Sequence, residues 1–109
     1  MENEISTIEQ GIIEGQAREM IRTCYDPEIP VNIFDLGLIY EVKANQLGDV
    51  HVLMTLTSPS CPAAQVLPKE VETKVKSIPG VKGVNVEVTW TPPWNPEMMS
   101  EAAKLELGF

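Results

Sequence analysis

The sequence predicts an α+β fold, a two-layer sandwich with the element order α-β-β-α-β-α and helices on one face of a small mixed sheet. Segments with apolar residues three and four apart alternate with segments in which every second residue is apolar, and prolines and glycines separate them. The alternating segments carry polar residues on one side, so the sheet should be covered on the other side alone. At 109 residues, the chain is expected to form one domain, residues 1–109.

A first helix is expected from Ser6 to Cys24. Ser6 and Glu9 have the spacing of a capping box. Gly11 and Gly15 lower the helix propensity of the first half of this segment, so the firm helix is predicted to begin nearer Gln16. Cys24, at the end of the apolar stripe, is predicted to be a core residue. The predicted buried stripe is Ile8, Ile12, Ile13, Ala17, Met20, Ile21 and Cys24.

Residues 26–37 contain two prolines three positions apart, which exclude a helix and predict an ordered loop. Residues 38–44 alternate as a first strand, residues 45–49 supply turn formers, and residues 50–57 alternate as a second strand. These two strands should pair antiparallel. The residues predicted to share one face of the first strand are Leu38, Tyr40, Val42 and Ala44.

The second half of the chain predicts a helix, a strand and a short final helix. The helix should run from Pro62 to about Ile78, with a kink or restart at Pro68. Residues 84–90 alternate as a third strand, and Asn95 can cap a final helix over residues 96–105. The predicted inner stripe of that last helix is Met98, Ala102 and Leu105.

Composition excludes several classes of function. The net charge is −8, with 16 acidic against 8 dispersed basic residues, so nucleic-acid binding and contact with anionic membranes are not expected. Two cysteines and one histidine are too few for a zinc site within one chain. No signal peptide and no apolar run of about 20 residues are recognised, so a cytoplasmic protein with reduced cysteines is expected.

Cys61 is the strongest candidate for a functional residue. It follows a Ser/Pro turn and stands directly before Pro62, which is favoured at the first position of a helix. Free backbone N–H groups and the helix dipole at such a position favour a thiolate, as in reactive or metal-binding cysteines. The alternative interpretation is a small apolar residue at a turn.

Other polar residues can be placed near that thiol. Thr57 and Ser60 lie on the approach to Cys61 and offer hydroxyl groups, although strand propensity and turn chemistry explain them equally well. Asp35 lies in the proline-constrained loop, which can reach the Cys61 end of the sheet; it is a candidate base or ligand, or a cap of its own loop. His51 is roughly 20–25 Å from Cys61 along the second strand, which excludes a Cys–His dyad.

The segment from Trp90 to Pro96 contains two tryptophans and three prolines. It can serve as a rigid strap that closes the core. If the third strand is parallel to the second, the segment also ends beside Cys61. Trp90, Pro93 and Trp94 are therefore candidates for a wall of the Cys61 site or for a docking edge.

Three motifs in order resemble the SufT/PaaD-type family of metal–sulfur cluster assembly proteins, which is related to the eukaryotic cytosolic iron–sulfur targeting factors. They are residues 26–40 (DPEIPVNIFDLGLIY), residues 55–62 (TLTSPSCP) and residues 92–108 (PPWNPEMMSEAAKLELG). The chain resembles single-domain SufT most, because it lacks the additional C-terminal cysteines of the PaaD-like proteins and the nucleotide-binding domain of the Mrp-type carriers. In this resemblance Cys61 matches the reactive cysteine, and Asp35 and Thr57 match motif positions.

The resemblance implies a non-catalytic maturation factor in which Cys61 holds iron or a transient iron–sulfur cluster. One thiolate cannot hold a cluster alone, so a homodimer or a complex with a scaffold, carrier or client protein is expected, with Cys61 near the interface. Two other hypotheses remain open. One is an enzyme with Cys61 as nucleophile, assisted by Asp35 and Thr57. The other is an adaptor that recruits clients through its tryptophan–proline segment and acidic surface.

Overall fold

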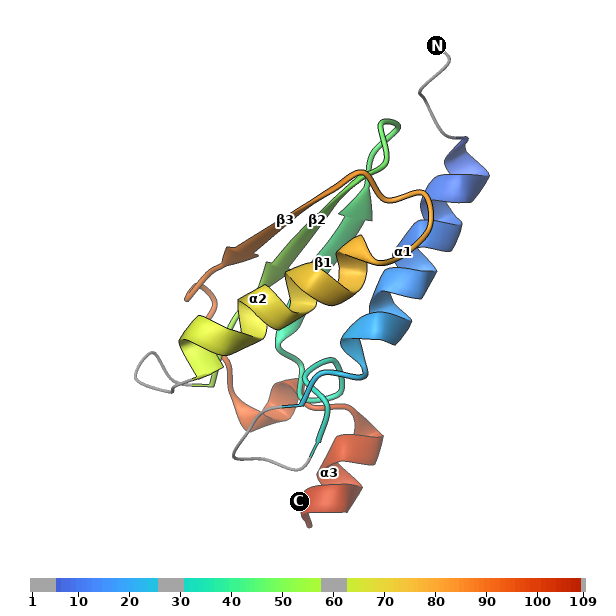
Figure 1. The fold of residues 1–109 in the computed structure, drawn as a ribbon. Coiled ribbons are helices and arrows are strands. Elements are labelled where there is room, and N and C mark those ends of the chain that lie inside the picture. Colours follow the sequence, from blue (N-terminus) through green and yellow to red (C-terminus); the bar gives the residue numbers. More distant parts are fainter. Residues whose placement is uncertain (1–5, 26–30, 58–62, 109) are drawn as a thin grey trace.

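The computed structural model describes residues 6–25, 31–57 and 63–108. Figure 1 shows the predicted order α-β-β-α-β-α, with the last helical segment divided into a 3-10 helix and an α-helix. The elements are α1 (Thr7–Ile21), β1 (Ile39–Ala44), β2 (Asp49–Met54), α2 (Ala63–Lys76), β3 (Gly83–Val88), η1 (Pro96–Met98) and α3 (Glu101–Leu107). Among these helices, none combines the length and the apolar character that crossing a membrane requires.

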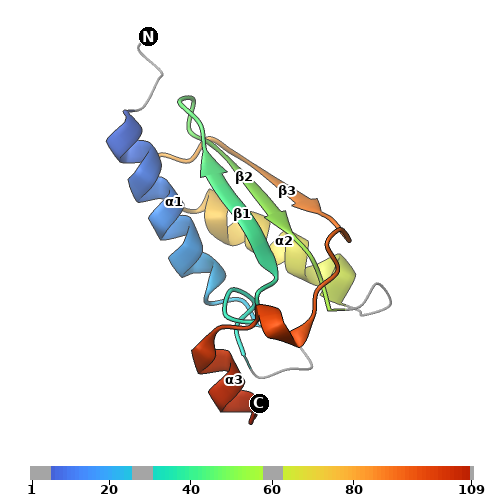
Figure 2. The ribbon, with the colours of Figure 1, turned by 180° about the vertical axis from the view of Figure 1, so that it is seen from behind.

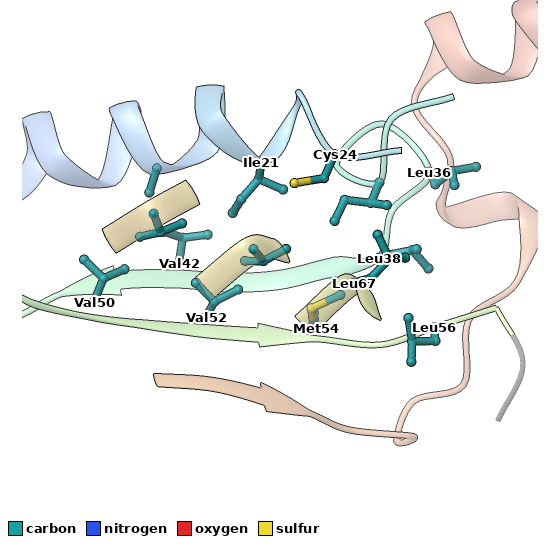
Figure 3. Close-up of a cluster of buried hydrophobic side chains, with 14 of the residues drawn as sticks. Ile21, Cys24, Leu36, Leu38, Val42, Val50, Val52, Met54, Leu56 and Leu67 are labelled. Atoms are coloured by element: carbon teal, nitrogen blue, oxygen red, sulfur yellow. The ribbon is translucent and has the colours of Figure 1, made fainter. Parts of the chain in front are cut away.

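The sheet has the order β1-β2-β3 and is mixed, which confirms the predicted α+β class. β1 pairs antiparallel with β2, and β3 pairs parallel with β2. Helices α1 and α2 lie on one face of the sheet, whereas η1 and α3 lie beyond its end (Figures 1 and 2). Only two of the predicted helices therefore form the second layer. Figure 3 shows side chains of both layers meeting in one core, among them Ile21, Cys24, Val42, Val52, Met54 and Leu67.

Helix α1 begins at Thr7, so the prediction of a firm start near Gln16 is wrong. The Ser6 side chain caps the helix by accepting a hydrogen bond from the backbone N–H of Glu9, at 3.1 Å. The glycines of the first half cost up to about 1 kcal/mol each relative to alanine, and packing against the sheet offsets that cost. The buried residues of the helix are Ile13, Ala17 and Ile21.

The predicted buried stripe of α1 was too wide. Ile8 and Ile12 have exposed fractions of 75% and 54%, so they lie outside the core. The buried residues instead recur four apart from Ile13, a strip that the sheet can cover without reaching the neighbouring positions. Cys24 is fully buried, which confirms its prediction as a core residue.

Helix α2 continues through Pro68 without a restart, which leaves a kink as the other predicted outcome. Pro68 is the sixth helical residue, so its missing N–H removes a hydrogen bond near the first turns. Apolar residues on the inner side hold the helix on the sheet across that position, which compensates for the loss. These buried residues are Leu67, Val71 and Val75, and Ile78 follows them.

The final helix differs from its prediction because the chain interrupts it. Asn95 caps η1 as expected, its side chain accepting a hydrogen bond from the backbone N–H of Glu97. Ser100 then caps a new helix, α3, by accepting a hydrogen bond from Ala103 N–H. This interruption changes the buried positions, so Met99 and Ala103 are buried and Leu105 is 79% exposed.

Candidate functional site

The C-terminal segment from Trp90 to Ser100 packs against the loop that precedes β1. The indole Nε1 of Trp94 donates a 2.6 Å hydrogen bond to the carbonyl oxygen of Leu36. The Tyr40 hydroxyl donates a 2.7 Å hydrogen bond to the carbonyl oxygen of Pro92. Both contacts join residues more than fifty positions apart, and they fix the tryptophan–proline segment at the end of the sheet.

A close backbone approach tightens the same junction. Gly37 has φ +84°, and a Cβ atom there would collide with the backbone carbonyl of Met98. Two residues away on each segment, the backbone N–H of Ser100 donates a 2.8 Å hydrogen bond to the carbonyl oxygen of Asp35. The C-terminal segment thus packs directly on the backbone of Asp35, Leu36 and Gly37. Glycine occupies position 37 because the left-handed conformation and the close approach of Met98 leave no room for a side chain.

Tyr40 reaches this junction because β1 is irregular there. Ile39 pairs with Met54, but the next pair joins Glu41 to Leu53, so Tyr40 is an additional residue on β1. Such a bulge redirects a side chain at the end of a strand. Sequence reasoning placed Tyr40 in a regular alternation, and nothing local in the sequence signalled its hydrogen bond to Pro92.

A cavity of about 480 Å³ lies beside this junction, lined by Leu56, Thr57, Trp90, Pro93 and Trp94. Since β2 and β3 are parallel, the chain leaves both strands at the same end of the sheet, and this brings Thr57 to the tryptophan–proline segment. Trp90 is 44% exposed, so one wall of the cavity faces solvent. The three candidates Trp90, Pro93 and Trp94 thus share one site with Thr57.

The remaining candidates, Ser60, Cys61 and Pro62, lie outside the described residues. Chain connectivity still limits the distance of Cys61 from the cavity. Cys61 follows Thr57 by four residues and precedes Ala63, the first residue of α2, by two. At about 3.8 Å between consecutive Cα atoms, the Cα atoms of Cys61 and Thr57 are at most roughly 15 Å apart.

Asp35 lies in a different place from Thr57. Its carboxylate accepts a 2.9 Å hydrogen bond from the Asn32 side chain, and its backbone N–H donates to the Asn32 side-chain oxygen. It lines a separate cavity of about 160 Å³, together with residues that include Tyr25 and Glu106. The structure therefore shows Asp35 as a group that orders its own loop and binds the C-terminal segment through its backbone, and it lines a different cavity from Thr57.

Two further polar residues belong to this part of the sheet, His51 on β2 and Thr55 directly after it. His51 lies on the uncovered face of the sheet, 3.0 Å from the Asn85 side chain and 3.7 Å from a carboxylate oxygen of Glu87. Thr55 is fully buried, and within the described part of the chain its Oγ1 atom has no hydrogen-bond partner. In that same part, no three His, Cys, Asp or Glu residues are grouped as a metal site.

The chemistry of Cys24 is unlike that of a reactive thiol. Burial and, to a smaller extent, the nearby carboxylate of Glu70 raise the pKa of Cys24 to about 11, against an opposing effect of Lys74. At neutral pH this thiol is therefore protonated and inaccessible. Cys24 is therefore a structural residue of the core.

Comparison with known proteins agrees with the three sequence motifs. Residues 14–88 match the family described as iron–sulfur cluster assembly protein. A protein of Porphyromonas gingivalis named Fe-S protein maturation auxiliary factor is 53% identical over 100% of this chain and 99% of its own length. The Staphylococcus aureus Fe-S protein maturation auxiliary factor SufT is 41% identical over 76% of this chain and 94% of its own length.

Solved structures show the same fold. The crystal structure of a domain of unknown function from Bacillus anthracis superposes with a TM-score of 0.88 at 34% identity, over 95% of this chain and 99% of that one. A conserved hypothetical protein from Thermotoga maritima superposes with a TM-score of 0.76 at 31% identity over the full length of both chains. The family match over residues 14–88 and the identity to the named relatives lead to one conclusion: this chain belongs to the iron–sulfur cluster assembly protein family.

Proposed function

We propose that this protein is an auxiliary factor in the maturation of iron–sulfur proteins, and that Cys61 is one ligand of the iron or cluster delivered to a client. The observation that carries the proposal is the aromatic cavity at Thr57, four residues before Cys61, in a chain of this family. The relatives named above are called maturation auxiliary factors.

The cavity supplies the environment that a transient metal–thiolate bond needs. Among the described residues, its walls are two indole rings, a proline and a leucine, and the Thr57 hydroxyl is the one polar side-chain group there apart from the indole nitrogens. An apolar shell controls solvent access to a metal site and protects its bonds from water and oxidants. Thr57 and Ser60 would then offer hydrogen bonds to the thiolate or to cluster sulfides.

The N-terminus of helix α2 supplies a positive electrostatic potential that would favour a thiolate. It begins at Ala63 and has no acidic residue in its first turn, so no carboxylate there opposes the positive end of the helix dipole. A thiol two residues before this helix would be favoured as the thiolate. The reducing cytoplasm would keep that thiol free.

One thiolate supplies a single ligand, whereas a cluster usually takes four. The other ligands are expected from a scaffold, a carrier, the client itself or a small thiol, and the cluster is cargo. A transferase in which Asp35 and Thr57 assist Cys61 has less support, because these two residues line different cavities.

The first experiment is cluster transfer to an apoprotein client under anaerobic conditions, with donor and client held constant. The wild type is compared with Cys61→Ser and with Cys24→Ala. We expect Cys61→Ser to remove the acceleration of transfer, and Cys24→Ala to retain it because that thiol is buried. Equal acceleration by Cys61→Ser and wild type would refute the role of Cys61.

The adaptor function is a second candidate, which the 44% exposure of Trp90 favours. An adaptor would bind clients through the aromatic wall and need no thiol. Client binding measured by calorimetry separates the two functions. If Cys61→Ser keeps both client affinity and transfer, and Trp90→Ala loses both, the protein is an adaptor; if Cys61→Ser keeps affinity and loses transfer, the thiol handles the cargo.

A further inference from the structure

The two edges of the sheet are not equivalent. At the outer edge of β1, a side-chain oxygen of Glu14 accepts a 2.9 Å hydrogen bond from the backbone N–H of Ala44, so α1 occupies a backbone group that a further strand would need. β3 forms the opposite edge, and within the described residues it pairs with β2 alone. Figures 1 and 2 show α1 on the β1 side of the sheet and no helix beyond β3.

The backbone of β3 presents a regular row of outward groups. Thr89 N–H donates to the carbonyl oxygen of Met54, and Val88 is the residue paired with Met54. In a parallel pair, alternate residues of one strand bond a given neighbour. The N–H and C=O groups of Val84, Val86 and Val88 therefore point away from β2, as an unpaired edge that can accept another strand.

The side chains of β3 separate into two faces. Val84, Val86 and Val88 are half-buried and pack against the core, whereas Asn85 and Glu87 are exposed on the uncovered face of the sheet. A twofold axis at Val86 would place each valine opposite a valine. It would also place Asn85 opposite Glu87 of the second copy, so that an amide faces a carboxylate and no two like charges meet.

The hydrogen-bonding pattern fits the same axis. In an antiparallel pair, directly opposite residues alternate between those that exchange two backbone hydrogen bonds and those that exchange none. The outward groups belong to residues 84, 86 and 88, which this axis pairs with 88, 86 and 84 of the second copy. Every outward group thus finds a partner without a bulge or a shift of register.

We propose that two copies of this chain pair antiparallel along β3 and join their sheets into one. The occupant of the edge is a second copy because the outward backbone groups and the valine face are both self-complementary about Val86, and because the axis brings no two carboxylates directly opposite each other. The contact is short compared with a standard interface, so the dimer is weak and dependent on concentration.

This arrangement has a consequence for the site. β3 leads directly to Trp90, and an antiparallel pair directs the two β3 strands in opposite directions. The two aromatic cavities would lie at opposite ends of the joined sheet, each open to its own partner. The dimer thus differs from one in which two Cys61 residues share a cluster.

Sedimentation velocity of the full chain, from about 10 μM to about 1 mM at low salt, tests the proposal. Asn85→Glu places like charges opposite each other twice in the dimer, and Asn85→Lys places opposite charges there. Cross-strand pairs of this kind predict a change of roughly 2- to 30-fold in the dissociation constant, weaker for Glu and tighter for Lys. Gln16→Glu adds the same single negative charge on α1 and should leave association unchanged.

Val86→Pro is the backbone variant. It removes an outward N–H that β2 does not use, so the fold should persist by circular dichroism while dimerisation is lost. A monomer at every concentration would overturn the proposal. A dimer that responds equally to Gln16→Glu and Asn85→Glu, or that survives Val86→Pro in a folded protein, would also overturn it, because it would use another surface.

Discussion

The indole of Trp94 donates a 2.6 Å hydrogen bond to the carbonyl oxygen of Leu36, which lies 58 residues earlier in the chain. Leu36 is fully buried and belongs to the loop that precedes β1. The contact therefore links two motifs of the sequence, residues 35–37 and residues 92–94, into one unit. The cavity beside Thr57 depends on that unit, because Trp94 is one of its walls.

Trp94→Phe should reduce the free energy of unfolding by about 1–3 kcal/mol, because it leaves the buried Leu36 carbonyl without the indole donor. Trp90→Phe is the control, since the Trp90 ring is partly exposed and no hydrogen bond of its indole N–H is found among the described residues. Urea denaturation measures both variants. Equal losses would mean that ring packing, and not the hydrogen bond, stabilises the junction.

Gly37→Ala should destabilise the protein by at least about 2 kcal/mol. The left-handed conformation costs a non-glycine residue roughly 1–2 kcal/mol, and the new Cβ would also collide with the Met98 carbonyl. Gly11→Ala is a matched control, because nothing lies within 4 Å of its Cβ position and helix propensity should improve stability by about 0.5–1 kcal/mol. In urea denaturation, the free energy of unfolding is expected to fall for Gly37→Ala and to rise for Gly11→Ala. A change of the same sign in both variants would contradict the geometry of the junction.

Cys24 should make stability fall in alkaline solution. Burial raises the pKa of Cys24 to about 11, above the value of about 8.5 for a thiol in an unfolded chain. As the pH rises between these values, the unfolded state loses a proton that the folded state keeps, so unfolding becomes more favourable. The contribution is complete below about pH 8.5, and up to roughly 3 kcal/mol is lost by about pH 11.

The measurement is the free energy of unfolding between pH 8 and pH 11 for wild type and Cys24→Ala. Groups common to both proteins, including Cys61, cancel in the difference. The variant is expected to show the shallower decline with pH, whatever its absolute stability. Parallel curves would show that Cys24 ionises equally in the folded and unfolded states.

Trp90→Ala should reduce the rate of cluster transfer several-fold in a protein that remains folded, because the ring is a solvent-facing wall of the cavity. Leu105→Ala is a suitable control, since Leu105 is 79% exposed and does not line this cavity. Transfer assays and denaturation are made on the same samples. A transfer rate unchanged by Trp90→Ala would separate the cavity from the function.

Much of this protein follows from local patterns in the sequence. The alternation of residues 38–44, 50–57 and 84–90 predicts the strands, and Ser6 and Asn95 predict caps that the structure confirms. These predictions are correct because the periodicity of apolar residues and helix capping depend on neighbours within a few residues. The three motifs likewise identify the family without any coordinates.

The errors arise where distant segments decide the outcome. Gln16 is not the start of the firm helix, because packing against the sheet stabilises the preceding glycine-containing turns. The final helix begins again at Ser100, whose backbone N–H binds Asp35. No local pattern contains that contact.

The sequence by itself determined the elements, the family and Cys61 as the candidate thiol. Only the tertiary structure decided that Asp35 and Thr57 line different cavities, that Trp94 binds the Leu36 carbonyl, and that Glu14 of α1 occupies a backbone N–H at the β1 edge of the sheet. The physical reason is the sequence separation of the interacting residues. Helix and strand patterns reflect neighbours along the chain, whereas a cavity or a sheet edge is formed by distant segments that folding brings together.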